Sequence, residues 1–181
     1  MSTLEVNTID SVSGTSTLTL GSTNSSAISL ADDTSLASGK LQSNFLYPVF
    51  HVVKTSAQSI ATATATDITY DTEKFDTDNA FSSTTFTVPS GQGGKYYFYA
   101  NNGLDGTAPS RTFVRIMQNG TGVLTVETGS ASGYSNIFVG GVVQCAVGDT
   151  FKTQIYHDQG SNANTHGSTA RAYFGGYRIG T

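Results

Sequence analysis

Residues 86–99 have the sequence FTVPSGQGGKYYFY, and this stretch decides the fold class. Residues 86–88 are predicted to form a strand that ends at Pro89, because proline has no N–H to contribute to a sheet interior. The three glycines that follow predict a turn. Residues 95–99 then hold four aromatic side chains in five positions, a composition typical of a strand rather than a helix.

Both faces of this aromatic strand are predicted to need cover. Side chains alternate along a strand, so Tyr96 and Phe98 share one face while Tyr97 and Tyr99 share the other. The core of a single domain covers only one of these faces. The stretch therefore indicates that the protein also buries surface against something outside its own core.

Composition limits the classes of function. The 181 residues suffice for one ordinary domain plus an appendage, with 12% charged residues and a net charge of −4. This charge gives electrostatic nucleic-acid binding little to work with, and no apolar run approaches the roughly 20 residues of a membrane span. The N-terminus shows no secretory signal, and the single cysteine, Cys145, is expected to be a small buried side chain rather than a reactive thiol.

The first 44 residues differ from the rest of the chain, because all 19 aromatic residues lie from Phe45 onward. Two interpretations compete for residues 1–44: a flexible Ser-rich linker, or an arm that becomes ordered on a partner or by winding with sister chains. Regularly spaced apolar residues favour the arm. The candidates for attachment are Leu4, Val6, Ile9, Leu18 and Leu20.

Residues 45–181 are predicted to be an all-β domain with eight to ten short strands and no helix. Such spacing favours an antiparallel sandwich or jelly roll. Asn119-Gly120 is a strong hairpin signal between residues 113–118 and 123–127, because both residues accept the positive φ of a type I′ turn. The other predicted strands are residues 47–53, 58–66, 68–70, 86–88, 95–99, 137–147, 150–157 and 170–179.

An acidic stretch, residues 71–79, is predicted to be a solvated turn. Oxygen-rich loops can bind Ca²⁺, so a calcium site at Asp71, Asp76 and Asp78 is the alternative. The spacing fits no EF-hand loop, and Lys74 lies among the carboxylates. The sequence thus favours the turn and predicts no bound metal or cofactor.

Four motifs in order give residues 47–181 a resemblance to the C1q-like (tumour-necrosis-factor-like) jelly-roll domain. Phe86-Thr87-Val88-Pro89 with the aromatic strand is similar to the family's F-x-V-P…G-x-Y-x-F signature. The others are Val114-x-Ile116 before Asn119-Gly120, Gly148-Asp149-Thr150-Phe151, and Phe174-Gly175-Gly176-Tyr177-Arg178-Ile179.

The resemblance implies a ten-stranded antiparallel jelly roll that assembles as a homotrimer. The residues support this expectation, since several strands carry large apolar groups on both faces and closed symmetry is the usual way to cover them. Phe113 and Met117 lie opposite Val114 and Ile116, for example. The expected core and trimer-packing residues are Phe86, Tyr96, Phe98, Phe113, Met117, Phe174 and Tyr177.

Catalytic motifs are missing from the sequence. His157-Asp158 could be drawn into a hydrolase triad, but no G-x-S-x-G elbow presents a nucleophile. The chain is therefore expected not to be an enzyme.

The N-terminal arm resembles the attachment segments of bacteriophage virion proteins, in place of the collagen-like stalk and export signal of animal C1q-like proteins. The resulting hypothesis is a trimeric capsid decoration or fibre protein, assembled in the bacterial cytoplasm on a major capsid or tail protein. One alternative is a tip that recognises host-surface glycan, with Tyr134 and His166 as ring candidates in Gly-rich loops. A secreted trimeric signalling ligand is the third class, and it needs an export signal.

Overall fold

A computed structural model describes residues 48–106, 109–129 and 135–180, which belong to the compact unit Ser43–Thr181. The expected attachment arm, with Leu4, Val6, Ile9, Leu18 and Leu20, lies outside the described residues. The described part of the chain contains strands and turns but no helix, so it has no helix that could cross a membrane.

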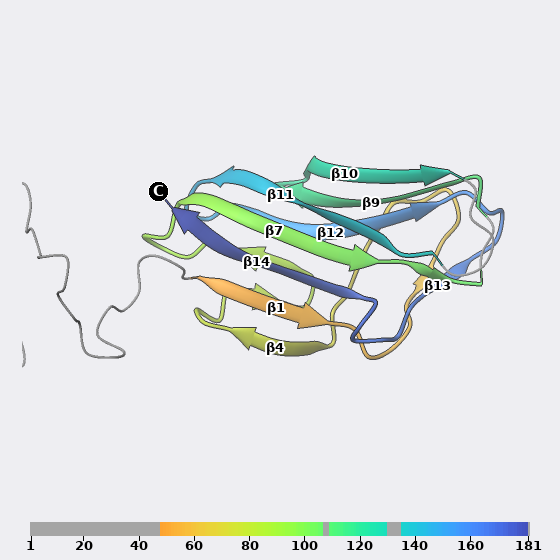
Figure 1. Cartoon of the computed structure of the whole chain (residues 1–181), viewed down its shortest axis with the longest axis horizontal. Coiled ribbons are helices and arrows are strands. Elements are labelled where there is room, and N and C mark those ends of the chain that lie inside the picture. The colour runs from red at the N-terminus through yellow and green to blue at the C-terminus, as the bar shows by residue number, and fades with distance from the viewer. Residues whose placement is uncertain (1–47, 107–108, 130–134, 181) are drawn as a thin grey trace, which may run out of the picture. The chain divides into compact units, whose positions relative to one another are not determined.

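The described residues form fourteen strands (Figure 1). Ten of them have three or more residues, and the other four are two-residue pairings. In chain order they are β1 Val49–Val53, β2 Ser59–Ile60, β3 Thr66–Asp67, β4 Thr72–Asp76, β5 Phe81–Ser82, β6 Thr85–Thr87, β7 Gly94–Asn102, β8 Leu104–Asp105, β9 Arg111–Gln118, β10 Thr121–Gly129, β11 Ile137–Cys145, β12 Thr150–His157, β13 Ala163–Thr165 and β14 Tyr173–Gly180.

Two antiparallel sheets make up the sandwich. The first has five strands in the order β11-β7-β14-β1-β4, and Figure 1 shows these side by side. The second follows the order β10-β9-β12-β6-β5, with β3 also paired to β12. A small third sheet, β2-β13-β8, lies at the end of the sandwich away from the C-terminus. The expected all-β antiparallel architecture is confirmed.

The core between the sheets is built from stacked aromatic rings. Phe98 of the first sheet stacks on Phe151 of the second with ring centroids 4.1 Å apart, and Phe50 stacks on Phe86 at 4.3 Å. All four side chains are fully buried. Such pairs add attraction beyond the burial of apolar area, so they fix the spacing of the two sheets.

The hairpin predicted at Asn119-Gly120 is confirmed. Asn119 has φ of 50° and Gly120 has φ of 84°, the positive values that a type I′ turn needs. Strands β9 and β10 pair from Thr121 opposite Gln118 to Gly129 opposite Arg111.

The segment between β1 and β6 departs from the predictions. Residues 71–79 were predicted to be a turn, yet Thr72–Asp76 forms β4 and pairs with β1 across a bulge. Charged residues are common on edge strands because they oppose further pairing, which explains why an acidic stretch can be a strand here.

Residues 68–70 were predicted to be a strand and are not one. The Ile68 N–H donates to the Thr153 carbonyl while the Tyr70 N–H donates to the Ser83 carbonyl, so the two groups bond to different segments and form no ladder. Residues 58–66, also predicted to be one strand, pair only at β2 and at Thr66 of β3. Ala63, with φ of 54°, breaks the extended chain between them.

Candidate functional site

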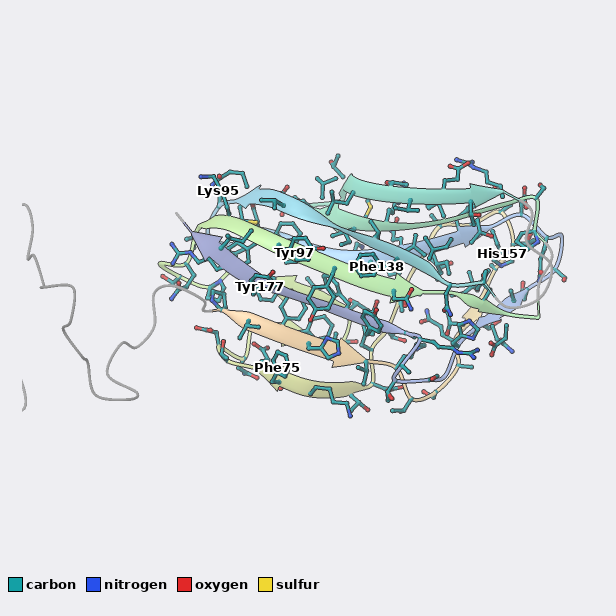
Figure 2. All side chains as sticks on the ribbon, viewed as in Figure 1. Phe75, Lys95, Tyr97, Phe138, His157 and Tyr177 are labelled. Carbon is teal, nitrogen blue, oxygen red and sulfur yellow. The ribbon has the colours of Figure 1, made fainter. Side chains whose placement is uncertain are left out.

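The outer face of the five-stranded sheet is rich in exposed apolar side chains. The described residues include eight exposed large hydrophobic side chains, and five of these lie on this face with 37–57% of their surface exposed: Phe75, Phe138, Val142, Tyr177 and Ile179. Figure 2 shows Phe75, Tyr177, Tyr97 and Phe138 on successive parts of the sheet. Scattered exposed apolar residues are normal, but a contiguous group marks an interaction surface.

Residues directly opposite in an antiparallel sheet share a face, so the register defines the surface. One row runs across four strands through Val142, Tyr97, Tyr177 and Val49. The next row runs through Gly140, Tyr99, Gly175, His51 and Phe75. With Phe138, Tyr173 and Ile179, these residues form what we call the aromatic face.

Glycines let the tyrosine rings lie flat on this face. A Cβ atom at Gly175 would come within 2.5 Å of the Tyr99 ring, and one at Gly140 would come within 2.9 Å of the Tyr97 hydroxyl. Tyr99 thus lies across Gly175 and reaches the next strand, where its hydroxyl is 3.0 Å from His51 Nδ1. Two glycines on this face therefore leave room for tyrosine rings from the neighbouring strand.

His51 lies at the centre of a ring cluster on the aromatic face. Its ring centroid is 5.8 Å from those of Phe75 and Tyr99 and 5.6 Å from that of Tyr173. Partial burial, with a smaller contribution from the Lys74 charge, lowers the pKa of His51. Burial likewise raises the pKa of Tyr99, so both groups are neutral near pH 7.

The outer face of the second sheet is different, because the fold itself covers its apolar groups. Phe113 and Met117 are only 8% and 5% exposed. Phe113 stacks on Tyr156 with centroids 4.9 Å apart, and the Arg111 and Arg115 guanidinium groups lie over the Phe113 ring at 5.4 and 5.1 Å. These two predicted trimer-packing residues therefore need no partner molecule.

Polar groups on this second face pair with one another. Arg111 forms a two-pronged ion pair with Glu127, with N–O distances of 2.8 and 2.9 Å. Arg115 donates to Gln154, whose amide in turn donates to Asp67 at 2.6 Å. A face that presents paired charges and polar groups can remain exposed to solvent without leaving apolar surface uncovered.

The other predicted packing residues divide between the core and the aromatic face. Phe86, Tyr96, Phe98 and Phe174 are buried between the sheets, while Tyr177 is exposed on the aromatic face. Cys145 is buried, and desolvation followed by the Asp149 charge raises the pKa of its thiol to about 12. It is thus protonated and unreactive at neutral pH.

The three carboxylates of the alternative calcium site do not come together. Asp71 accepts hydrogen bonds from the backbone and hydroxyl groups of Thr55 and Ser56. Asp76 accepts from the Phe81 N–H at 2.7 Å and Asp78 from the Thr77 hydroxyl at 2.7 Å. Within the described ranges, no group of three His, Cys, Asp or Glu side chains could hold a metal ion.

His157 and Asp158 do not form a catalytic pair. The His157 ring is fully buried, with Nε2 3.1 Å from the Ile60 carbonyl oxygen, and it lies at the end away from the C-terminus (Figure 2). Asp158 instead accepts from Ser110 and from the Arg111 N–H.

His166 is closer to a triad in composition but not in geometry. The buried His166 ring contacts Asp105 through Nδ1, and its Nε2 lies 2.9 Å from the main-chain carbonyl oxygen of Ser135. The Ser135 hydroxyl is engaged by the Leu104 N–H at 3.2 Å. His166 therefore has no hydroxyl nucleophile to activate, because its Nε2 faces a carbonyl oxygen. Its contacts with Asp105 and Ser135 instead link separate segments of the chain.

Sequence reasoning missed much of the aromatic face. Phe75 fell in a segment predicted to be a turn, and His51 was not among the candidate residues. The spacing of Tyr97 and Tyr99 predicted part of this face, and the same two-residue spacing of Phe138 and Val142 with the intervening Gly140 could have added β11 to it.

No protein-family model and no curated protein matches the chain. Solved structures do match. Murine APRIL at pH 5.0 has a TM-score of 0.58 with 16% identity, covering 73% of this chain and 98% of that one, and murine APRIL at pH 8.0 gives 0.58 and 17% over the same shares. The globular domain of zebrafish complement 1qA has a TM-score of 0.52 with 18% identity, covering 73% of this chain and 97% of that one.

The described domain is a C1q/TNF-like jelly roll. At these identities the likeness shows the fold alone. The jelly roll predicted from the ordered sequence motifs is therefore confirmed.

Proposed function

We propose that the protein is a non-enzymatic structural protein that assembles as a homotrimer through its aromatic face. The observation that carries this proposal is the exposure of five large apolar side chains on one sheet face, beside half-buried rings at His51, Tyr97, Tyr99 and Tyr173. Burying this surface against sister copies removes apolar area from water, which is the main favourable contribution to association.

Closed three-fold symmetry needs two different surfaces on each protomer, since a heterologous contact joins one patch to another. The aromatic face is one. The second is the side of the sandwich where β10 packs beside β11, which exposes Val123 and Val126. Leu124 lies beneath Gly141 of β11, so the two strands form one continuous side.

The outer face of the second sheet also supports the proposal that the aromatic face is the one buried in the trimer. Its rings are covered by arginines and its charges are paired, so it gains little from leaving water. In the proposed trimer this face is exposed on the outside of the particle that the three copies form.

We further propose that this trimer is a decoration or fibre protein of a phage virion. Support comes from the resemblance of residues 1–44 to virion attachment segments and from the course of the chain. Val49 pairs with Tyr177, so the described chain enters and leaves at one end of the sandwich. That leaves the end with β8 and β13 free to project outward.

A glycan-recognising tip has less support. His166, one of the two ring candidates, is buried against Asp105 and Ser135 and presents no ring to a sugar. Tyr134, the other candidate, lies outside the described residues.

Sedimentation velocity of the full chain tests the trimer. The unmodified protein is expected to sediment as a trimer at micromolar concentration. Tyr177→Glu, which puts a charge on the aromatic face, is expected to give folded monomers. Thr87→Glu on the exposed part of β6 is the matched control and is expected to remain trimeric. A folded monomer in the unmodified protein contradicts the proposal.

The virion assignment has its own test. Electron microscopy of phage particles labelled with an antibody against the jelly roll is expected to show regularly placed label on the capsid or the tail. Unlabelled particles alongside free trimer in the same lysate contradict this assignment and leave the trimer standing.

A further inference from the structure

We propose that acid releases the trimer, because protonation of His51 puts a positive charge in the interface formed by the aromatic face. The inference rests on the proposed trimer. It goes beyond that assembly by naming the group that controls it.

The surroundings of His51 are rings rather than carboxylates. Phe75 and Tyr99 stack on it at 27° and 28°, and Tyr173 packs against it at 42°. The Tyr99 hydroxyl, 3.0 Å from Nδ1, is the one polar contact recorded for the ring within the described residues. A half-buried imidazole in this position loses its remaining water when a sister copy covers the face.

The titratable and charged groups around His51 give an added proton little compensation. Burial keeps the Tyr99 phenol on β7 neutral, and the Tyr173 ring on β14 packs against the imidazole. The positive charge of Lys74 on β4 repels a cation. Lys74 lies at the bulge that separates the pairs His51–Phe75 and Val52–Glu73.

Two carboxylates lie on the same strand, β4. Asp76 accepts hydrogen bonds from the Asp78 and Phe81 N–H groups, and Glu73 is exposed to water.

Two effects oppose each other on protonation. Aromatic rings attract a cation, which favours the imidazolium. Desolvation disfavours it, and desolvation increases when the trimer forms whereas the three intramolecular rings are already in place in the monomer. Desolvation therefore makes protonation of His51 less favourable in the trimer than in the monomer. Each trimer contains three such histidines, so the effect occurs three times.

The remaining histidines lie elsewhere. His157 is buried between the sheets and His166 against the Ser135 carbonyl, so neither is on the aromatic face. Any effect of acid that comes from them persists when His51 is replaced.

The test is sedimentation velocity of the full chain over a concentration series at about pH 7.5 and about pH 5, with circular dichroism to confirm that the fold is kept. The concentration at which half the trimer dissociates is expected to rise at least about tenfold at the lower pH. In His51→Gln, which is neutral at both values, the ratio between the two pH values is expected to fall to about one.

A second measurement covers the case in which His51→Gln is monomeric at every pH. The NMR titration midpoint of the His51 ring in the unmodified protein is expected to move to lower pH as protein concentration rises, because the trimer favours the neutral ring. A midpoint that does not depend on concentration overturns the inference.

The outcomes separate the two proposals. A trimer with the same dissociation concentration at both pH values, or one that acid tightens, overturns the role of His51 and leaves the trimer standing. Equal acid sensitivity in the unmodified protein and in His51→Gln does the same. A folded monomer at both pH values overturns the proposed function itself.

Discussion

Tyr99 shows how one glycine can organise a surface. Its ring crosses Gly175 because no Cβ atom stands there, and in that position its hydroxyl lies 3.0 Å from His51 Nδ1. Glycine in a strand often marks such a close approach. The position of the Tyr99 ring on the aromatic face thus depends on a residue that has no side chain.

Replacing Gly175 by alanine is expected to destabilise the protein by about 1–3 kcal/mol, the usual cost of overpacking. The new methyl group would lie 2.5 Å from the Tyr99 ring and 2.9 Å from the Phe50 carbonyl oxygen, and the backbone atom cannot move aside easily. Chemical denaturation measures the loss. Gly180→Ala on the same strand is the control, because a Cβ atom there meets nothing within 4 Å. Equal losses in both variants would contradict the explanation.

Asn119 links the hairpin turn to the neighbouring loop. Its amide nitrogen donates to Asp149 at 2.7 Å and its oxygen accepts from the Thr150 N–H at 2.9 Å. Hydrogen bonds from Asn119 and from the Ala146 N–H lower the pKa of Asp149.

Asn119→Asp is expected to cost about 1 kcal/mol at neutral pH, because it removes a donor and places two carboxylates side by side. The loss should shrink in high salt, which screens the repulsion. Urea unfolding at two salt concentrations measures both effects. The double variant Asn119→Asp with Asp149→Asn restores opposite roles at the contact and is expected to recover part of the stability; no recovery would show that the turn conformation dominates instead.

At the scale of elements, Asp71 fastens the segment after β1 to the start of β4. Its two oxygens accept four hydrogen bonds from Thr55 and Ser56 at 2.5–3.0 Å. Desolvation acts in the opposite direction, but the four bonds prevail and hold the pKa of Asp71 well below its ordinary value. Asp71, in the segment predicted to be a turn, therefore connects the end of β1 to the start of β4.

A lowered folded-state pKa adds stability that is present above the unfolded-state value of about 4 and is lost as pH falls through the folded-state value. Asp71→Asn is thus expected to be less stable than the unmodified protein at pH 7, by about 1 kcal/mol given its exposure. The two stabilities should converge as pH falls below about 4. Thermal unfolding from neutral to acidic pH measures this, and a gap that stays constant with pH would exclude the carboxylate as its source.

Local patterns predicted some elements well and others badly, for a physical reason. The β9–β10 hairpin and β12 were predicted because turn residues and alternation are encoded within a few positions. Strand β4 was not, because it exists through its pairing with β1 across a chain separation that sequence pattern does not reveal. Strand propensity is set largely by such neighbours.

The candidate site also has a part that local sequence predicted and a part that depends on contacts between distant strands. Alternation at residues 95–99 predicted a second buried face, and Tyr177 was correctly placed among outward rings. Phe113 was expected to need a sister copy, but Tyr156 and two arginines cover it, and those contacts come from β12 and from the same strand. Whether an outward apolar side chain is already covered depends on contacts between different strands, and the sequence of one strand does not show these contacts.

At the scale of the whole molecule, the two sheets of the described domain have outer faces of different chemistry. One carries exposed rings and aliphatic groups, the other paired charges and arginine-covered rings. In the proposed trimer, a closed assembly with the aromatic faces inward would remove these rings and aliphatic groups from water.

Unfolding of the proposed trimer must depend on protein concentration, since one trimer releases three unfolded chains. The thermal midpoint of the unmodified protein is therefore expected to rise as concentration increases from about 1 to about 100 µM, whereas Tyr177→Glu should unfold at a midpoint that concentration does not move. Differential scanning calorimetry across the series measures both. Thr87→Glu is expected to behave as the unmodified protein does, because β6 lies in the second sheet. A concentration-independent midpoint in all three proteins would mean that each copy folds and unfolds alone, and that the aromatic face is not buried by sister chains.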